Sequence, residues 1–376
     1  MSMKARLGDY IQEYSVRNRA EEDIPVYSVT NTQGFCQDYF GKEVASKDKS
    51  TYKVVPKGCF AYNPSRINVG SVDWQRYEDR VIVSPLYNVF SVAPQLDQQY
   101  LYYYLKSDFA LQRIKAVATG SVRDNLKLTM LFEFPINLPS MEVQKEIVKK
   151  LDGVKRVISL REQEMQTLDD LIKARFVEMF GKPESDEKYP QIAIKDFTDV
   201  ISGGTPDRKN NEYWENGTVP WVKTTELQNT RINTVEECIT EKGLNESAAK
   251  VVPEDTVLIA MYGQGKTRGM TAILGIPAST NQACACILPC EEVEPKYLWQ
   301  YMIMSYDRLR NQAQGGNQPN LNGNMIKNFT VLVPPKELQS QFVQFVEQVD
   351  KSKVAVQKAL DEAQVLFDSL MQKFFG

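Results

Sequence analysis

The sequence predicts an α+β chain in which two α/β domains form a pseudo-twofold repeat, separated by two long helices that pair as an antiparallel coiled coil. Three observations predict this fold. Residues 120–181 align with residues 315–376 without a gap, each copy carries a heptad pattern of apolar residues, and a strand-rich stretch precedes each pattern. Together they indicate two equivalent modules in one chain.

The repeat is supported by identical residues at equivalent places. Asn125 aligns with Asn320, and Gln144 aligns with Gln339. A chain that contains two such modules can mimic a dimer. Dimer-like binders suit partners that present two half-sites with approximate twofold symmetry.

Residues 140–181 are predicted to form the first long helix. Ser140 can cap its start, and Gly181 followed by Pro183 is a typical stop signal. Apolar residues recur at alternating spacings of four and three, which is typical of a coiled-coil seam. The seam residues are Ile147, Leu151, Val154, Ile158, Met165, Leu168, Ile172 and Met179, with Arg161 and Arg175 at the two remaining positions.

Residues 334–376 repeat this seam at the same offset. Two matched seams can pair with each other, and helices of about 40 residues would be roughly 60 Å long. The alternative is that each helix packs only on its own globular neighbour. The second seam consists of Phe342, Val346, Val349, Val356, Leu360, Ala363, Phe367, Leu370 and Phe374, with Lys353 as the exception.

The two α/β domains are expected at residues 1–139 and 182–333. Short strand-like runs such as 24–29 and 257–260 alternate there with turn signals. The two halves match only loosely outside the repeat, so the scaffold is shared while the loops differ. Divergent loops on a common frame allow two related modules to read different ligands.

Composition and charge restrict the function. Of 376 residues, 42% are apolar, no apolar run approaches 20 residues, and the N-terminus shows no signal segment. We therefore expect a cytoplasmic protein with no membrane partner. The formal net charge of −3 counts against a dedicated nucleic-acid binder, unless partners supply phosphate contacts.

The chain has no histidine, and none of its six cysteines forms a CxxC pair. Neither Ser-His-Asp nor Cys-His catalysis is possible without imidazole, which lowers the expectation of catalysis without removing it. A zinc site would need cysteines and carboxylates alone. Reduced thiols in a cytosolic protein, with no metal bound, are the better interpretation.

The segment 260–267 fits a permissive phosphate-loop pattern. A phosphate loop must open a helix, whereas Gly269, Gly275 and Pro277 favour a hairpin. We interpret the segment as a basic hairpin tip and keep a nucleotide-binding enzyme built on residues 260–267 as an alternative. The tip carries side chains suited to base edges and phosphates, namely Gln264, Lys266, Thr267 and Arg268.

Two further segments supply candidate DNA-contacting residues. The loop of the first half that corresponds to the hairpin tip offers Tyr62, Asn63, Arg66 and Asn68, and a strand-like run in the second half ends in Lys223 and Thr224. Asn63-Pro64 superficially resembles an adenine-methyltransferase motif. It lacks the second proline and the aromatic residue that stacks on a flipped base, so no intrinsic methyltransferase activity is expected.

Taken together, these features resemble the specificity subunit of type I restriction–modification systems. The resemblance covers essentially the whole chain, but the first half lacks the Gly-Gly-Thr-Pro turn of the second. The motifs that carry it are Gly203-Gly204-Thr205-Pro206, Pro220-Trp221, Asn320-Leu321 with Phe329, and Pro334-Pro335 with Gln339.

The resemblance implies a non-catalytic subunit that holds no cofactor of its own. Target-recognition domains at 1–139 and 182–333 would each read half of a split double-stranded DNA sequence, mainly in the major groove. The helices at 140–181 and 334–376 would set the gap between the half-sites. They would also dock two adenine-N6 methyltransferase subunits, which carry S-adenosylmethionine. Restriction subunits that use ATP and magnesium would join the complex.

Two further alternatives remain open at this point, in addition to the nucleotide-binding enzyme. One is a related system in which cleavage and methylation share one partner chain, and the other is a coiled-coil scaffold with no nucleic-acid role. The bases read and the gap length do not follow from the sequence, because readout depends on side-chain placement and DNA shape.

Overall fold

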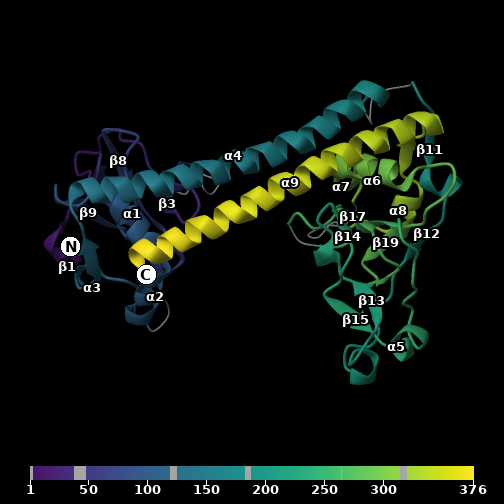
Figure 1. Cartoon of the computed structure of the whole chain (residues 1–376), viewed down its shortest axis with the longest axis horizontal. Coiled ribbons are helices and arrows are strands. Elements are labelled where there is room, and N and C mark those ends of the chain that lie inside the picture. The colour runs from purple at the N-terminus through teal and green to yellow at the C-terminus, as the bar shows by residue number, and fades with distance from the viewer. Residues whose placement is uncertain (1–2, 38–47, 119–124, 183–187, 264, 314–319) are drawn as a thin grey trace. The chain divides into compact units, whose positions relative to one another are not determined.

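The computed structural model describes residues 3–37, 48–118, 125–182, 188–263, 265–313 and 320–376. The chain folds as two compact units (Figure 1). Unit 1 comprises Met1–Gln163 and Gln357–Gly376, and unit 2 comprises Glu164–Val356. Each long helix therefore contributes one half to unit 1 and the other half to unit 2.

Unit 1 is built around a four-stranded antiparallel sheet with the order β2-β9-β6-β7. Three short antiparallel pairs, β1 with β10, β3 with β4 and β5 with β8, complete its strands. The strands are β1 (Met3–Arg6), β2 (Ile11–Glu13), β3 (Ser28–Thr30), β4 (Gly34–Cys36), β5 (Lys53–Pro56), β6 (Phe60–Tyr62), β7 (Val72–Trp74), β8 (Arg80–Val83), β9 (Asn88–Val92) and β10 (Pro135–Leu138).

Short helices cover this sheet and join it to the long helices. The Asp97 carboxylate caps α1 by accepting from the Tyr100 N–H at 2.9 Å, and Ser107 caps α2. Phe60 and Phe90 stack in the core with ring centroids 5.1 Å apart. The helices are η1 (Leu7–Asp9), η2 (Ile67–Val69), α1 (Gln98–Lys106), α2 (Asp108–Val117) and α3 (Leu128–Phe132).

Unit 2 repeats the plan with a five-stranded sheet of order β12-β19-β16-β17-β14. A small sheet, β15-β13-β18, and the pair β11–β20 complete its strands. Every residue of β16, β17 and β19 is buried, which explains their apolar runs. The strands are β11 (Gln191–Ala193), β12 (Val200–Ser202), β13 (Val219–Val222), β14 (Thr230–Ile232), β15 (Glu237–Ile239), β16 (Val257–Ala260), β17 (Thr271–Leu274), β18 (Ser279–Thr280), β19 (Cys284–Ile287) and β20 (Thr330–Leu332).

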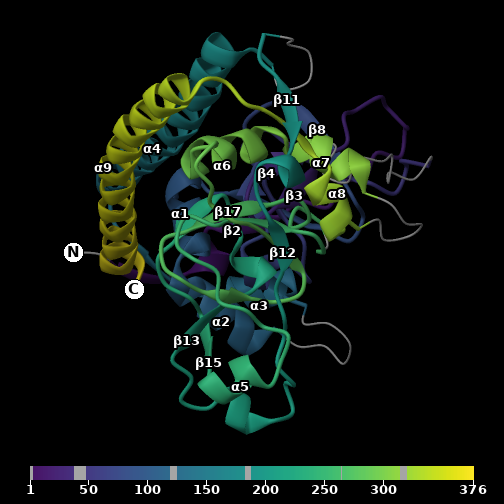
Figure 2. The ribbon, with the colours of Figure 1, turned by 90° about the vertical axis from the view of Figure 1, so that its right-hand side faces the viewer.

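Helix α6 lies between the large sheet of unit 2 and the long helices. Figures 1 and 2 both show α6 beside the long helices, with β17 next to it and with β13, β15 and α5 at the far end of the unit. The helices are η3 (Ile194–Asp196), η4 (Asn211–Tyr213), η5 (Thr224–Glu226), α5 (Glu241–Asn245), α6 (Pro295–Met304), α7 (Tyr306–Gln312) and α8 (Gly323–Lys327).

The two predicted long helices are present as α4 (Met141–Phe180) and α9 (Lys336–Phe375), and they pair antiparallel. In unit 1, the first half of α4 shares an apolar cluster with the end of α9, through Leu151 and Phe375. In unit 2, the end of α4 meets the start of α9, where the rings of Phe176 and Phe342 lie 5.4 Å apart. The alternative, in which each helix packs only on its own globular neighbour, is therefore wrong.

Polar residues in the seam find partners on the opposite helix within unit 2. Lys353, the exception in the second seam, forms an ion pair with Asp169 of α4. The Arg175 guanidinium lies 5.7 Å from the centre of the Phe345 ring of α9. These pairings explain how charged side chains occupy positions that a coiled coil normally gives to apolar residues.

The duplicated glutamines perform the same structural task in both units. The buried Gln144 Oε1 accepts from the Asp97 N–H at 2.8 Å, and its Nε2 donates to the Pro139 carbonyl at 2.9 Å. Gln339 Oε1 accepts from the Glu294 N–H at 2.8 Å, and its Nε2 donates to the Pro334 carbonyl at 2.8 Å. Each glutamine thus ties the start of a long helix to the loop that leads into α1 in unit 1 or into α6 in unit 2.

Candidate nucleic-acid interface

The strand orders show which loops of the two modules are equivalent. In unit 1 the order β2-β9-β6-β7 matches β12-β19-β16-β17 in unit 2. The β6–β7 loop, residues 63–71, therefore corresponds to the β16–β17 loop, residues 261–270. A shared hydrogen bond supports this, because Leu126 N donates to Pro64 O at 3.1 Å and Leu321 N donates to Met261 O at 3.0 Å.

The β16–β17 loop is a hairpin tip, as predicted. β16 and β17 pair antiparallel, and Gly269 N donates to Ala260 O at 2.9 Å to close the loop. Gly265 and Gly269 have φ angles of 59° and 86°, in the left-handed region that favours glycine. The chain enters a strand after Thr267 rather than a helix, so the geometry of a phosphate loop is absent and the nucleotide-binding alternative loses its basis.

Helix α7 holds the backbone of this tip. The Tyr306 hydroxyl donates to Lys266 O at 2.7 Å, and Arg310 Nη1 donates to Arg268 O at 2.7 Å. The Lys266 side chain is exposed, whereas Thr267 and Arg268 are half-buried. The tip is thus anchored through its carbonyl groups and presents Lys266 to the solvent. Gln264, the fourth predicted residue, lies outside the described residues.

The charge of Lys223 is already paired within the protein, which its place at a strand end did not indicate. Its Nζ forms ion pairs with Glu236 at 2.7 Å and Glu237 at 2.9 Å. Hydrogen bonds to Glu236 and then Glu237 raise the pKa of Lys223 above its usual range. A phosphate would compete with two carboxylates for this cation. Thr224 begins η5 and is half-buried.

The Gly203-Gly204 turn serves packing in unit 2. A Cβ on Gly204 would lie 2.3 Å from the Ala248 carbonyl carbon, so only glycine fits there. The Gly204 carbonyl accepts from Trp221 Nε1 at 2.9 Å. The Arg208 guanidinium lies 3.7 Å from the centre of the Trp214 ring. The close packing of unit 2 therefore explains the glycine at position 204 without a DNA contact.

In unit 1 the structure corrects one candidate residue. Tyr62 has no exposed surface, and burial raises its pKa. Its hydroxyl donates to Leu126 O at 3.0 Å and accepts from Asn88 Nδ2 at 2.9 Å. A fully buried ring cannot reach DNA in this conformation. Tyr62 therefore belongs to the core, and we leave it out of the interface proposed below.

The other three candidates of the first module lie at the surface of the β6–β7 loop. Asn63 Oδ1 accepts from the Ser65 N–H at 3.1 Å and from the Ser65 hydroxyl at 3.0 Å, which shapes the turn. Arg66 is exposed, and Asn68 is half-buried within η2. The loop therefore presents one cation, Arg66, as the β16–β17 loop presents Lys266.

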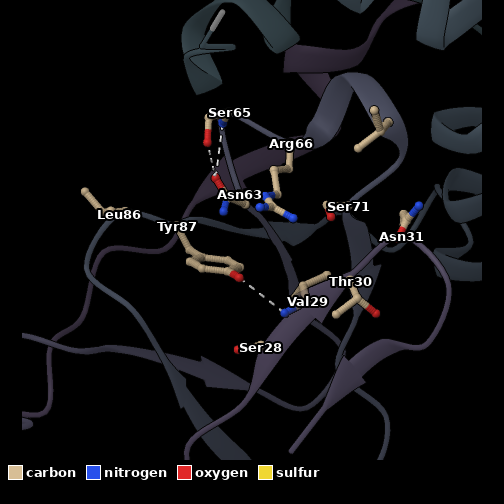
Figure 3. A pocket seen from close by; sticks show the side chains of 11 residues that line it. Ser28, Val29, Thr30, Asn31, Asn63, Ser65, Arg66, Ser71, Leu86 and Tyr87 are labelled. Atoms are coloured by element: carbon tan, nitrogen blue, oxygen red, sulfur yellow. Dashed lines mark hydrogen bonds between the residues drawn. The ribbon is translucent and has the colours of Figure 1, made fainter. Parts of the chain in front are cut away.

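Arg66 faces a recess of about 510 Å³ that the sequence did not reveal (Figure 3). Two apolar side chains of its lining are exposed, Leu86 at 77% and Val69 at 57%. The recess is formed by three separate stretches of the chain, and no local pattern connects them. Its lining residues are Ser28, Val29, Thr30, Asn31, Asn63, Ser65, Arg66, Val69, Ser71, Leu86 and Tyr87.

A partly buried lysine anchors two walls of this recess. Lys106 Nζ donates to Asn31 O at 2.9 Å and also to Gly70 O. Desolvation lowers the pKa of Lys106 to about 8, although Asp73 acts in the opposite direction. Burial in turn raises the pKa of Asp73. Lys106 therefore holds the loop of unit 1 much as Arg310 holds the tip of unit 2.

Apolar side chains also stand exposed on the long helices. Leu171 of α4 is 46% exposed and Leu366 of α9 is 51% exposed, and these two residues are equivalent in the repeat. Val365 and Leu160 are exposed as well. The repeat therefore places an exposed leucine at the same position on both long helices.

The part of the chain that the structure describes shows neither a metal-ligand cluster nor a membrane-spanning helix. No group of three or more His, Cys, Asp or Glu side chains could hold a metal ion among the residues that the structure describes. Within the same part of the chain, no helix is both long enough and apolar enough to span a bilayer.

The family model for the type I restriction modification DNA specificity domain matches residues 8–169 and 187–363. The chain belongs to this family. The two matched segments correspond to the two halves of the repeat, each with an α/β module and most of its long helix. The resemblance found in the sequence is therefore confirmed.

Curated relatives agree with this family membership. The EcoR124I/EcoR124II specificity subunit of Escherichia coli is 24% identical over 215 residues, which are 56% of this chain and 52% of that protein. The MjaIX specificity subunit of Methanocaldococcus jannaschii is 30% identical over 163 residues, 42% of this chain and 37% of that protein. The matched parts thus span about half or less of these relatives.

Solved structures share the fold over the whole chain. A chain from a type I R-M system, described for its complex assembly and conformational transition, has a TM-score of 0.61 at 19% identity. It covers 100% of this chain and 97% of its own length. The S subunit of a type I restriction–modification system from M. genitalium has a TM-score of 0.53 at 16% identity, with 100% and 96% covered. At such identities the similarity speaks for the fold alone.

Proposed function

We propose that this specificity-family chain reads a bipartite sequence in double-stranded DNA, with one half-site for each recognition domain. The observation that carries the proposal is the pair of equivalent loops on matching sheets, each presenting one exposed cation, Arg66 and Lys266. The recognition domains are assigned to residues 1–139 and 182–333. We infer that Asn63, Asn68, Lys223, Thr224, Gln264, Thr267 and Arg268 complete the DNA-contacting set.

The long helices are proposed to set the gap between the half-sites. Helices α4 and α9 each contain 40 residues, so each is about 60 Å long. A paired helix is stiffer than a peptide linker, which suits it to hold a fixed spacing. Half-site spacing in DNA is measured in helical turns of about 34 Å, so a span of this size is appropriate for a split target.

We further propose that the chain is non-catalytic and acts through partners. Two adenine-N6 methyltransferase subunits, which carry S-adenosylmethionine, would dock on the helices. The repeat places Leu171 and Leu366 at equivalent positions, so it supplies one exposed apolar position for each of two partner copies. Restriction subunits that use ATP and magnesium would join the same complex in the cytoplasm.

The net charge of −3 fits a reader that shares the task of DNA binding. Phosphate contacts supply much of the affinity of DNA-binding proteins, and cations provide them. A chain with a small negative charge gains affinity from partners that neutralise phosphates on either side of the target. We therefore expect tight, salt-sensitive binding by the partner-bound complex and weaker binding by the chain alone.

The test is a map of adenine methylation by long-read sequencing in a host that carries this gene and its neighbouring methyltransferase gene. A strain that lacks only this gene is the matched control. We expect a split motif whose methylation disappears in the control, which would give both half-sites and the gap. An unchanged methylome, with the protein expressed beside its neighbours, would favour a coiled-coil scaffold without a DNA-reading role.

A further inference from the structure

The recess beside Arg66 has a lining suited to an anion. Among the residues that the structure describes, its lining contains one cationic side chain and no acidic one, and most of the remaining lining residues carry hydroxyl or amide groups. The hydroxyl-bearing residues Thr30 and Ser71 line it and are 5% and 3% exposed. A guanidinium surrounded by hydrogen-bond donors, without a neighbouring carboxylate, is an arrangement that favours a phosphate oxygen.

Three other arginines of unit 1 have carboxylate partners, whereas Arg66 has none in the part of the chain that the structure describes. Arg76 pairs with Asp73, Arg80 pairs with Glu22, and Arg6 pairs with Glu133. Arg66 forms no ion pair with any carboxylate among the described residues. Its positive charge is therefore available to a ligand, whereas the charges of the other three are already balanced.

Asn63, which also lines the recess, has a side-chain donor that, within the described part of the chain, is free to bind a ligand. Because Asn63 Oδ1 accepts both hydrogen bonds from Ser65, its Nδ2 donor is turned away from Ser65. Figure 3 shows this nitrogen on the same side as the Arg66 guanidinium, which extends into the recess toward Ser71 and Thr30. Asn63 and Arg66 thus both line the recess with donor groups, and the Asn63 amide acceptor is already occupied.

The shape of the recess favours a phosphate over a base edge as its ligand. Base edges lie at the floor of the major groove, about 8.5 Å deep, and projecting side chains reach them. Arg66 instead lines a hollow together with Leu86 and Val69, which are the strongly exposed apolar side chains of its lining. A phosphodiester on the ridge of a duplex is convex and anionic, so it fits such a hollow.

We propose that this recess is a phosphate-binding site, with Arg66 as its cation and Asn63 as a second donor. The proposal rests on the proposed function in one respect, namely that the phosphate belongs to the DNA backbone. Arg66 then fixes the register of the first module on the duplex and carries no sequence information itself. Free inorganic phosphate has the same chemistry and is the other possible source.

The first experiment uses the complex with its methyltransferase partner. Binding to a duplex that contains the methylated motif, and to one that lacks it, is measured between 50 and 200 mM salt for wild type and for Arg66→Gln. For Arg66→Gln we expect roughly tenfold weaker binding to both duplexes. The salt slope, which is the slope of log affinity against log salt concentration, should fall in magnitude by about 0.9. The DNA motif that is recognised should not change. Arg66→Lys should restore the slope. A relaxed motif with an unchanged slope would make Arg66 a base reader and overturn the proposal.

A matched control and a second measurement keep the two proposals separable. Arg80→Gln removes another exposed arginine of unit 1, but one paired with Glu22, and should leave the salt slope unchanged. Binding of inorganic phosphate to the full chain is followed by phosphorus NMR. If the complex binds no DNA, the proposed function fails, yet phosphate binding that Arg66→Gln abolishes would still support the site. If Arg66→Gln changed neither phosphate binding nor the dependence of DNA affinity on salt, the proposed phosphate site would be overturned.

Discussion

The β6–β7 loop of unit 1 and the β16–β17 loop of unit 2 occupy the same place in two matching sheets, yet they are built differently. The first contains the short helix η2 and borders a recess. The second is a glycine-rich hairpin whose Lys266 is exposed to solvent. Gly70 and Gly269 share a φ of 86° at the end of each loop, where the chain turns into the next strand.

The two loops are anchored by the same device. A cation from a neighbouring helix donates to a loop carbonyl, Lys106 to Gly70 O in unit 1 and Arg310 to Arg268 O in unit 2. Each loop is therefore held through a backbone carbonyl, which leaves its exposed side chains free to differ. This is the arrangement expected of two modules that share a scaffold and read different half-sites.

The largest expected effect comes from the duplicated glutamines. Gln144→Leu and Gln339→Leu keep most of the side-chain volume but leave a backbone N–H and at least one carbonyl without a partner. We expect each variant to lower the free energy of unfolding by about 3 kcal/mol, measured by urea denaturation. The neighbouring exposed residue Lys145 provides the control, because Lys145→Leu should change stability little. A large loss in only one glutamine variant would break the equivalence of the two units.

The loop anchors should give the next largest effect, and it should be specific to one half-site. Lys106→Met and Arg310→Met each remove a hydrogen bond to a loop carbonyl, at a cost of about 1–2 kcal/mol. On the proposed function, Lys106→Met should weaken methylation of sites through one half of the motif, and Arg310→Met through the other. Methylation rates on duplexes with one altered half-site measure this. Identical effects of both variants on both half-sites would contradict the proposal that each domain reads one half-site.

The exposed tip of unit 2 should give a moderate effect. Lys266→Ala removes an exposed charge without disturbing the anchoring carbonyl, since Tyr306 bonds to the backbone of Lys266. We expect about a tenfold lower methylation rate at the target, from the loss of one charged DNA contact. Lys209→Ala removes another exposed lysine of unit 2 and is the control. An unchanged rate for Lys266→Ala would exclude this tip from the interface.

A separate prediction concerns pH and only unit 1. The pKa of Lys106 is about 8 in the folded chain, below its ordinary value of 10.5, because burial disfavours the charged form. The folded state then binds fewer protons than the unfolded state between these values, so its stability rises with pH across that window. Relative to Lys106→Met, the wild type should therefore gain stability from about pH 8 to pH 10.5 in denaturation experiments. A flat difference would show that Lys106 keeps its ordinary pKa.

Much of the fold could be predicted because its signals are local or repeated. The heptad spacing of Ile147, Leu151 and Ile172 specifies a helix face wherever that helix packs. The aligned Gln144 and Gln339 indicated two equivalent modules before any contact was known. Gly269 and Pro277 distinguished a hairpin from a phosphate loop, since both residues act on the backbone of their own segment.

The tertiary structure decided what those signals leave open, because burial and pairing depend on residues that are distant in the sequence. Tyr62 is polar and ends strand β6, yet packing buries it completely. Lys223 follows a strand too, but Glu236 and Glu237 from a later strand region balance its charge. The recess at Arg66 joins residues 28–31, 63–71 and 86–87, which only the folded chain brings together. Periodicity predicts which elements form, whereas the availability of a side chain to a ligand is set by its neighbours in space.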